Sequence, residues 1–170
     1  YEVNISLFDA MAGTIEGGKD QHRVARFLCA HTIMLALEGV PAIYLHSLLA
    51  TPNAHDLVAE TGRARSINRR QWDEADLEAA LADPELPHRV VLDALLHLIR
   101  VRKAQPAFHP NATQYTLHFG DAVFAFWRES LDRDQNIFAL HNITDRAQQI
   151  GLAELNLIGT DSWRDLLTNE

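Results

Sequence analysis

The sequence is poor in cysteine, with Cys29 as the only one among 170 residues. A single thiol excludes an internal disulfide and fits a reducing compartment, so we expect a cytoplasmic protein. No run of apolar residues reaches the roughly 18 that a membrane-spanning helix needs, and we expect no membrane partner. The nine histidines show neither an HExxH motif nor paired ligand spacing, so the sequence predicts no metal site.

Basic residues are scarce as well. Lysine and arginine total 15 against 23 aspartates and glutamates, which gives a formal net charge of −8. Binding to nucleic acid needs a basic face that releases counterions, so no nucleic-acid partner is expected. Against this background the stretch AETGRARSINRR, residues 59–70, places four arginines within eight positions. It is either a solvated loop or a site for an anion.

Apolar spacing organises the first part of the chain. It predicts a helix over residues 21–38, with Asp20 as a candidate N-cap and Gly39 as its C-terminal cap. The run VPAIYLHS that follows predicts a strand over 41–46, buried on both faces as in parallel sheets. A second long helix is predicted over 87–104.

Between these elements lies a long excursion, from about residue 47 to residue 85, which contains the four arginines. A short helix that begins at Asp73 is expected within it. Helix, buried strand, loop and helix are typical of a parallel α/β unit. One strand is too few for a sheet, so we expect the chain to be a piece of a longer protein.

The hydrophobic period changes after residue 108. Alternating residues predict antiparallel strands around 115–119, 122–130 and 136–144, and AQQIGL (147–152) and SWRDLL (162–167) are candidates for shorter ones. The predicted fold class is therefore α/β, followed by a small antiparallel all-β domain. We place the boundary between residues 1–108 and 109–170.

Three segments resemble a known family. YEVNISLFDAM, GKDQHRVARFLCAHTIMLALEGVPAIYLHSLLAT and TGRARSINRRQW are similar to the C-terminal third of the sucrose phosphorylase branch of the α-amylase superfamily. Within that branch they are most similar to the glucosylglycerate phosphorylases. The match extends to about residue 105, and the remainder resembles only in general that superfamily's small C-terminal β-domain.

The resemblance implies the C-terminal portion of a (β/α)₈ barrel, with residues 1–12 in the loop after the seventh strand and 20–38 as the seventh helix. Residues 41–46 would be the eighth strand and 87–104 the eighth helix. Sites in such barrels lie at the C-terminal ends of the strands, so the arginine-rich stretch would lie at the mouth.

The resemblance also implies the chemistry. Family members are retaining glucosyl transferases, in which an aspartate takes the glucosyl unit and a glutamic acid protonates the leaving oxygen before phosphate attacks. No carboxylate here matches those motif positions, so we assign no catalytic residue to this chain and expect it to be inactive alone. Inorganic phosphate is the expected co-substrate, and no other cofactor is implied.

Four residues are candidates for binding sugar or phosphate. Arg65 resembles the family arginine that contacts phosphate or the leaving group, because its planar fork suits phosphate oxygens. Tyr1 and Glu2 fall in the family's acceptor-site loop, where sucrose phosphorylases usually have glutamine at the second position. His46 ends the predicted strand and could bind an acceptor carboxylate, or be a core histidine bonded to backbone.

The predicted function is thus part of an α-glucoside phosphorylase that acts on glucosylglycerate or a similar glucoside. Sucrose and sucrose 6'-phosphate phosphorylases are the alternatives within this class. A stand-alone binding module without chemistry is the alternative outside it. An incomplete barrel would expose apolar surface, and such surface promotes association into homo-oligomers.

Overall fold

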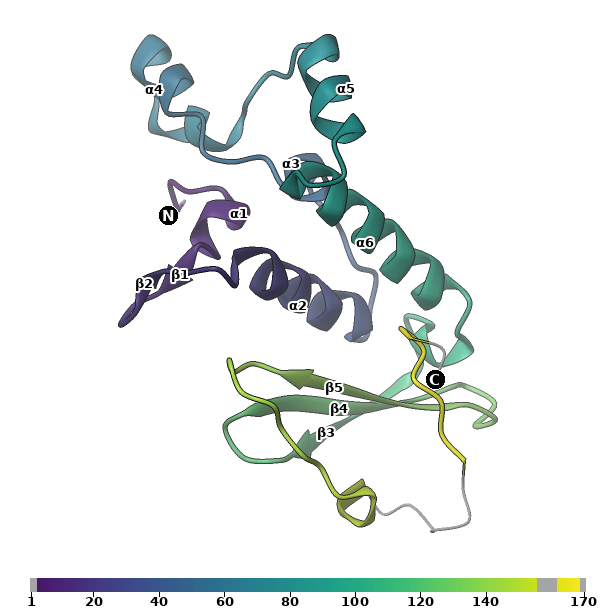
Figure 1. Ribbon diagram of the computed structural model, residues 1–170. Coiled ribbons are helices and arrows are strands. Elements are labelled where there is room, and N and C mark those ends of the chain that lie inside the picture. The colour runs from purple at the N-terminus through teal and green to yellow at the C-terminus, as the bar shows by residue number, and fades with distance from the viewer. Residues whose placement is uncertain (1–2, 156–161, 169–170) are drawn as a thin grey trace. The chain divides into compact units, whose positions relative to one another are not determined.

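The computed structural model describes residues 3–155 and 162–168, which divide into two compact units (Figure 1). The first unit takes in the chain up to His31 and then Ala42–His97, and the second takes in Thr32–Pro41 and the chain from Leu98 onward. The domain boundary expected between residues 108 and 109 stays a prediction.

The two long helices predicted from the apolar spacing are confirmed. The first and last residues of each helix lie within two residues of the predicted bounds. Asp73 caps the short helix as expected, its carboxylate accepting a bond of 3.0 Å from the N–H of Ala75. Three short helices were not predicted. In chain order the α-helices are α1 (Leu7–Ala10), α2 (Arg23–Ala36), α3 (Leu45–Leu48), α4 (His55–Thr61), α5 (Glu74–Ala82) and α6 (Pro87–Lys103).

The strands form two antiparallel sheets. A short hairpin pairs β1 (Gly13–Thr14) with β2 (Gly18–Lys19). The larger sheet has the order β3 (Thr113–His118), β4 (Val123–Glu129) and β5 (Asn136–Asn142), which confirms the three main predicted strands (Figure 1). The two shorter predictions are wrong, since neither 147–152 nor 162–167 pairs as a strand.

The strand predicted over 41–46 is also wrong for this structure. Residues 42–44 form no ladder, although the backbone at Tyr44 is extended, and α3 begins at Leu45. An apolar run becomes a buried strand only when neighbouring strands satisfy its backbone. The described part of the first unit offers only the two-residue hairpin, and Tyr44 and Leu45 remain 53% and 60% exposed.

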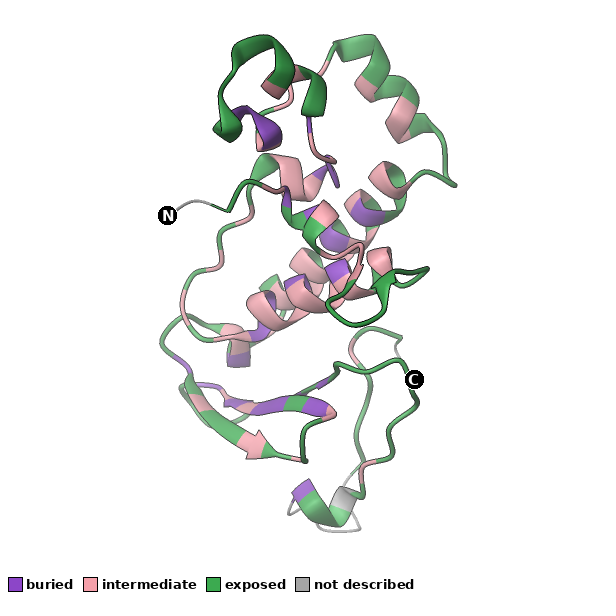
Figure 2. Cartoon of the chain, turned by 90° about the vertical axis from the view of Figure 1, so that its left-hand side faces the viewer, coloured by how far each residue is buried: buried purple, intermediate pink, exposed green. Residues whose placement is uncertain are grey.

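The core of the first unit takes buried residues from α1, α2, the turn after α3 and α6, and Figure 2 shows the buried residues in purple. The rings of Phe8 and Phe27 pack edge to face at 5.3 Å, and Phe27 is fully buried. His31 lies one turn further along α2, with Nδ1 2.9 Å from the carbonyl oxygen of Phe27. Burial lowers the pKa of His31, so the neutral imidazole is favoured at this position.

The second unit buries an arginine at its centre. Arg128 of β4 is fully buried, and its guanidinium donates to the carbonyl oxygens of Ala36 at 2.8 Å and His109 at 2.9 Å. Arg102 donates to the carbonyl oxygens of Leu35 and Gly39. The C-terminal carbonyls of a helix lack intrahelical donors and carry partial negative charge, so the two arginines cap α2.

Phe126 packs beside Arg128 on the same face of the sheet, and the apolar cluster there also contains Ala36 and Ala139. Burial, and then the positive charge of Arg102, lower the pKa of Arg128. The cost of burying this charge is offset by hydrogen bonds to carbonyl oxygens, because burying a charged group is unfavourable unless it is paired or bonded.

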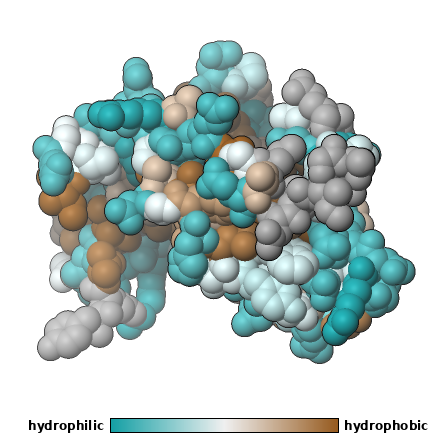
Figure 3. Space-filling model, turned by 90° about the horizontal axis from the view of Figure 1, so that it is seen from below, coloured by the Kyte–Doolittle hydropathy of each residue, from teal (hydrophilic) through white to brown (hydrophobic). Residues whose placement is uncertain are grey.

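Large apolar side chains also remain at the surface, and Figure 3 shows such hydrophobic residues among hydrophilic ones on one face. Ile15 and Val40 are among the most exposed. Within residues 3–155 and 162–168, no helix combines the length and apolar character needed to cross a bilayer.

Candidate functional site

A hollow of about 360 Å³ opens in the first unit. Three segments that are distant in sequence build it: the chain around α1, the chain from Tyr44 to Thr51, and the end of the 3₁₀ helix η1 (Ala64–Asn68). Its described lining holds hydroxyl, amide, imidazole and apolar groups but no acidic or basic side chain apart from the imidazole. The lining residues are Val3, Ile5, Ser6, Leu7, Phe8, Ala10, Tyr44, His46, Ser47, Thr51 and Asn68.

Hydrogen bonds through Asn53 hold α1 against this site. The Asn53 side chain accepts from the N–H of Ser6 at 2.7 Å, and the N–H of Asn53 donates to the carboxylate of Asp9 at 2.6 Å. Asp9 also forms an ion pair with Arg23 of α2, whose guanidinium lies 3.8 Å from the centre of the Phe8 ring. The wall of the hollow formed by α1 is therefore fixed from two sides.

The 3₁₀ helix η1 forms the middle of the arginine-rich stretch, and hydrogen bonds hold it against neighbouring segments. Ser66 and Ile67 are buried, and the carbonyl oxygen of Ile67 accepts from the N–H of Ala54 at 2.7 Å. The hydroxyl of Tyr44 donates to the carbonyl oxygen of Asn68 at 3.2 Å. These bonds join the end of η1 to the residue that precedes α4 and to the residue that precedes α3, where the hollow opens.

Arg65 is exposed on η1, three residues before Asn68. Side chains three apart on a 3₁₀ helix eclipse one another, so Arg65 lies one turn from Asn68 on the same face. Asn68 lines the hollow and Arg65 does not. This places Arg65 next to the rim, and its role in binding phosphate stays a prediction.

The other three arginines of the cluster differ from one another. Arg63 and Arg69 are exposed, whereas Arg70 is half-buried with its guanidinium 4.4 Å from the centre of the Trp72 ring. A cation above an aromatic face is attracted by the ring quadrupole. Arg70 therefore helps to hold Trp72 in place.

His46 lies in α3 and forms part of the lining. Its Nδ1 is 3.2 Å from the hydroxyl oxygen of Thr51, and its ring meets that of Tyr44 edge to face at 5.1 Å. Burial lowers the pKa of His46, so the neutral form is favoured near pH 7. Its predicted contact with a ligand has no test here, and Tyr1 and Glu2 lie outside the described residues.

Sequence reasoning missed Thr51, Trp72 and Asn53. Thr51 is 1% exposed and accepts a hydrogen bond of 3.1 Å from the indole N–H of Trp72. The position of Trp72, two residues after the arginine-rich stretch, was the available signal. Thr51 and Asn53 carried none, because a single threonine or asparagine in a loop is common in any protein.

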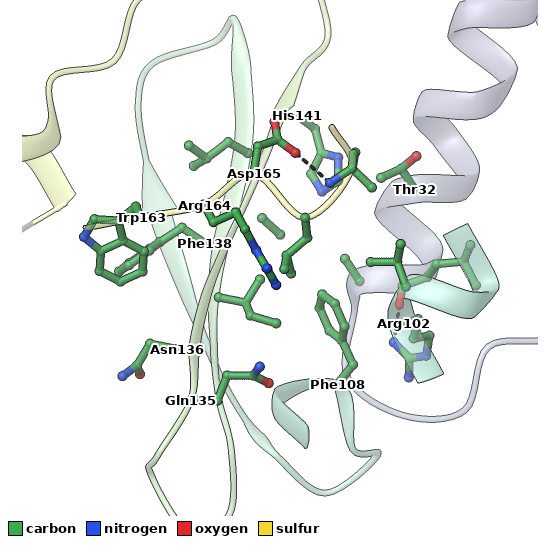
Figure 4. A pocket seen from close by; sticks show the side chains of 18 of the residues that line it. Thr32, Arg102, Phe108, Gln135, Asn136, Phe138, His141, Trp163, Arg164 and Asp165 are labelled. Carbon is green, nitrogen blue, oxygen red and sulfur yellow. Dashed lines mark hydrogen bonds between the residues drawn. The ribbon is translucent and has the colours of Figure 1, made fainter. Parts of the chain in front are cut away.

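A larger hollow, of about 630 Å³, lies in the second unit (Figure 4). Several of its polar side chains already serve the fold. Gln135 accepts from the N–H of Ala107 at 2.9 Å and donates to Gln105 at 2.7 Å, and Asn136 accepts from the indole of Trp127 at 2.8 Å. Arg102 caps α2, as described above. We therefore take the smaller hollow of the first unit as the candidate site.

Across the described ranges, no three histidine, cysteine, aspartate or glutamate side chains gather in a way that could hold a metal ion. No protein-family model matches the chain.

Curated relatives match almost the whole chain. It is 39% identical over 163 residues, or 96% of its length, to the glucosylglycerate phosphorylase of Allomeiothermus silvanus. It is 30% identical over 170 residues to the glucosylglycerate phosphorylase of Escherichia coli. The resemblance to the glucosylglycerate phosphorylases is thus confirmed.

The chain spans 29% and 30% of the length of these two glucosylglycerate phosphorylases, so it corresponds to less than a third of either one. Among solved structures, the sucrose 6F-phosphate phosphorylase of Thermoanaerobacter thermosaccharolyticum overlaps 69% of the chain and is itself covered to 24%. That overlap has a TM-score of 0.47 and 24% sequence identity.

Proposed function

We propose that this chain is part of a retaining α-glucoside phosphorylase that transfers glucose from glucosylglycerate, or a similar glucoside, to inorganic phosphate. The observation that carries the proposal is the 39% identity to a glucosylglycerate phosphorylase over 96% of the chain. In this reaction the bond from the anomeric carbon to the acceptor oxygen breaks. A phosphate oxygen then bonds to that carbon with the original configuration, which takes two displacements.

Within this proposal the first unit contributes the last helices and loops of a (β/α)₈ barrel. The exposure of the apolar run supports a larger assembly, because Tyr44 and Leu45 remain more than half exposed and the neighbouring elements of a complete barrel would cover such side chains. The hollow would then lie at the mouth of the barrel, where barrel sites are found.

Arg65 would bind phosphate, and His46, Tyr1 and Glu2 would bind the acceptor. The catalytic carboxylates would come from outside this chain, so we expect the chain alone to be inactive. No cofactor besides the phosphate co-substrate is proposed. A cytoplasmic location belongs to the same proposal, supported by the single cysteine.

The test is the phosphate dependence of the full-length protein. Arg65→Ala should raise the KM for phosphate about 10- to 100-fold, as expected for losing a hydrogen bond between charged groups. Arg63→Ala, which removes a neighbouring exposed arginine, is the matched control and should leave that KM within about twofold. An unchanged phosphate KM in Arg65→Ala would refute the assignment.

The substrate is tested separately. Glucosylglycerate, sucrose and sucrose 6'-phosphate should each be supplied with phosphate, and the release of glucose 1-phosphate measured. The proposal expects glucosylglycerate to give the highest kcat/KM. No phosphorolysis of any of the three by the full-length protein would favour the non-catalytic binding module.

A further inference from the structure

The turn that follows α3 brings Thr51 back onto His46. The N–H of Thr51 donates to the carbonyl oxygen of His46 at 2.8 Å, and the two side chains meet at 3.2 Å. Ala50, between them in sequence, is fully buried with φ at +48°. A residue other than glycine is rare in the left-handed region and costs about 1 kcal/mol or more, so the surrounding contacts hold this turn in a defined shape.

Counting hydrogens then fixes the direction of each bond. The indole N–H of Trp72 can only donate, so the hydroxyl oxygen of Thr51 is its acceptor. Thr51 is 1% exposed, and a buried hydroxyl hydrogen needs an acceptor of its own. The Nδ1 atom of His46 is the acceptor within reach, and a ring nitrogen that accepts carries no hydrogen.

We propose that Trp72 and Thr51 are positioning residues that hold His46 in its neutral form with the hydrogen on Nε2. The chain of donors runs from the indole N–H of Trp72 to the hydroxyl of Thr51 and from that hydroxyl to Nδ1. His46 then offers the hollow a hydrogen-bond donor without a positive charge.

The same arrangement disfavours the imidazolium. A protonated His46 would donate from Nδ1 to Thr51, whose hydroxyl hydrogen would then lose its acceptor in a buried place. Leaving such a group unsatisfied costs more than a hydrogen bond normally contributes. Burial of His46 acts in the same direction.

Trp72 links this chain of hydrogen bonds from Trp72 through Thr51 to His46, the relay, to the arginine-rich stretch. The Arg70 guanidinium lies above one face of its ring, and His88 meets the ring edge to face at 5.2 Å. His88 is itself fixed, with Nδ1 2.7 Å from the carbonyl oxygen of Leu49. One arginine of the cluster therefore serves the geometry of the hollow.

The neutral lining of the hollow and the charged Arg65 on η1 indicate which chemical group of a ligand each would bind. This inference rests on the proposed function. The lining supplies neutral donors and acceptors, which suit the hydroxyl oxygens of a sugar or polyol acceptor. Positive charge is found on η1, at Arg65, where an anion would be met. His46 is thereby assigned a hydroxyl oxygen of the ligand as its partner, in place of the acceptor carboxylate that was one of the two alternatives left open by the sequence.

The test is spectroscopic and needs no activity, so its outcome is independent of the proposed function. The chain is 19.1 kDa, and its histidines can be labelled with ¹⁵N. In the unmodified chain near pH 7.5, the His46 ring should show an unprotonated Nδ1 and a protonated Nε2. A hydrogen on Nδ1 instead, or on both nitrogens, would overturn the proposal without any variant being made.

Two variants then test the relay itself. Thr51→Val and Trp72→Phe keep the shape but remove the hydroxyl and the indole N–H, respectively. Thr51→Val should lower the ratio of the Nε2–H to the Nδ1–H form about tenfold, as expected for losing one hydrogen bond, and Trp72→Phe should lower it by less. Thr61→Val is the matched control, because its hydroxyl donates to the carbonyl oxygen of Leu57, away from His46. An unchanged ratio in Thr51→Val, in a chain that remains folded by its amide spectrum, would refute the relay.

Discussion

The second unit and the arginine-rich stretch of the first unit differ in how their arginines are placed. In the second unit, Arg128 is fully buried and Arg102 donates to the carbonyls at the end of α2, so both guanidinium groups hold secondary structure together. In the arginine-rich stretch, Arg63, Arg65 and Arg69 are exposed, and none of them lines the hollow, whose described lining has no basic side chain other than an imidazole. An arginine buried against carbonyl oxygens is thus a structural support, whereas binding is proposed only for the exposed Arg65.

The units also differ in how their polar contacts are distributed. The second unit aligns three strands in an unbroken register, so its side chains are fixed cooperatively. The first fixes its hollow with separate bonds, such as those through Asn53 and Thr51, which join loops. Loss of one contact should therefore disrupt the second unit widely and the first only locally.

The largest effect on stability is expected from removing the buried guanidinium of Arg128. Arg128→Met keeps much of the apolar stem but leaves the carbonyl oxygens of Ala36 and His109 without their donor. Because unsatisfied buried carbonyls cost about 1–3 kcal/mol each, we expect the free energy of unfolding to fall by about 3 kcal/mol. Urea unfolding followed by circular dichroism measures this loss.

Arg133→Met is the control for that variant. Arg133 has an 82% exposed side chain whose ion pair with Glu129 is long, at 3.6 Å, so the change should stay within about 0.5 kcal/mol. Equal losses in the two variants would mean that burial of Arg128 does not support the second unit.

The second prediction concerns a histidine of the same unit. His141 is 6% exposed, burial lowers its pKa to about 4, and its Nε2 is buried with no partner among the described residues. The unfolded chain takes up a proton at this residue below about pH 6.5, whereas the folded chain does so only near pH 4. The contribution of His141 to the free energy of unfolding is therefore constant above about pH 6.5. It falls by about 3 kcal/mol as the pH is lowered from 6.5 to 4.

His141→Leu removes that titration and should flatten the dependence of the unfolding free energy on pH within this window. Chemical unfolding of both chains at pH 7.5, 6, 5 and 4 gives the comparison. The difference between the chains isolates His141 from His31 and His46, whose pKa values burial also lowers. Parallel curves for the two chains would contradict the prediction.

Much of the fold was predictable because local patterns determine it. The helices α2 and α6 and the three strands of the larger sheet follow from apolar periods of 3.6 and 2. The strand expected over 41–46 failed because β-structure depends on partners, and a sequence pattern carries no information on whether they are present. Arg128 could not be foreseen either, since a charged residue in a strand is normally exposed.

The site was less predictable than the fold. Arg65 and His46 were identified by resemblance, and the structure puts them near one hollow without showing what they bind. Thr51 and Trp72 were missed because their importance is a hydrogen bond between residues 21 apart in sequence. Such a bond depends on how the loop returns, and composition and spacing do not encode that return.

The smallest expected effect tests whether the first unit responds locally. Asn53→Ala removes the acceptor for the N–H of Ser6, which is 5% exposed, and should lower the free energy of unfolding by about 1 kcal/mol. Hydrogen exchange of the Ser6 amide should accelerate severalfold, while the amides of β4 keep their rates. Asn4→Ala, at an exposed neighbouring position, should change neither quantity. Faster exchange throughout β4 in Asn53→Ala would show that the two units unfold together, and the local character assigned to the first unit would then be wrong.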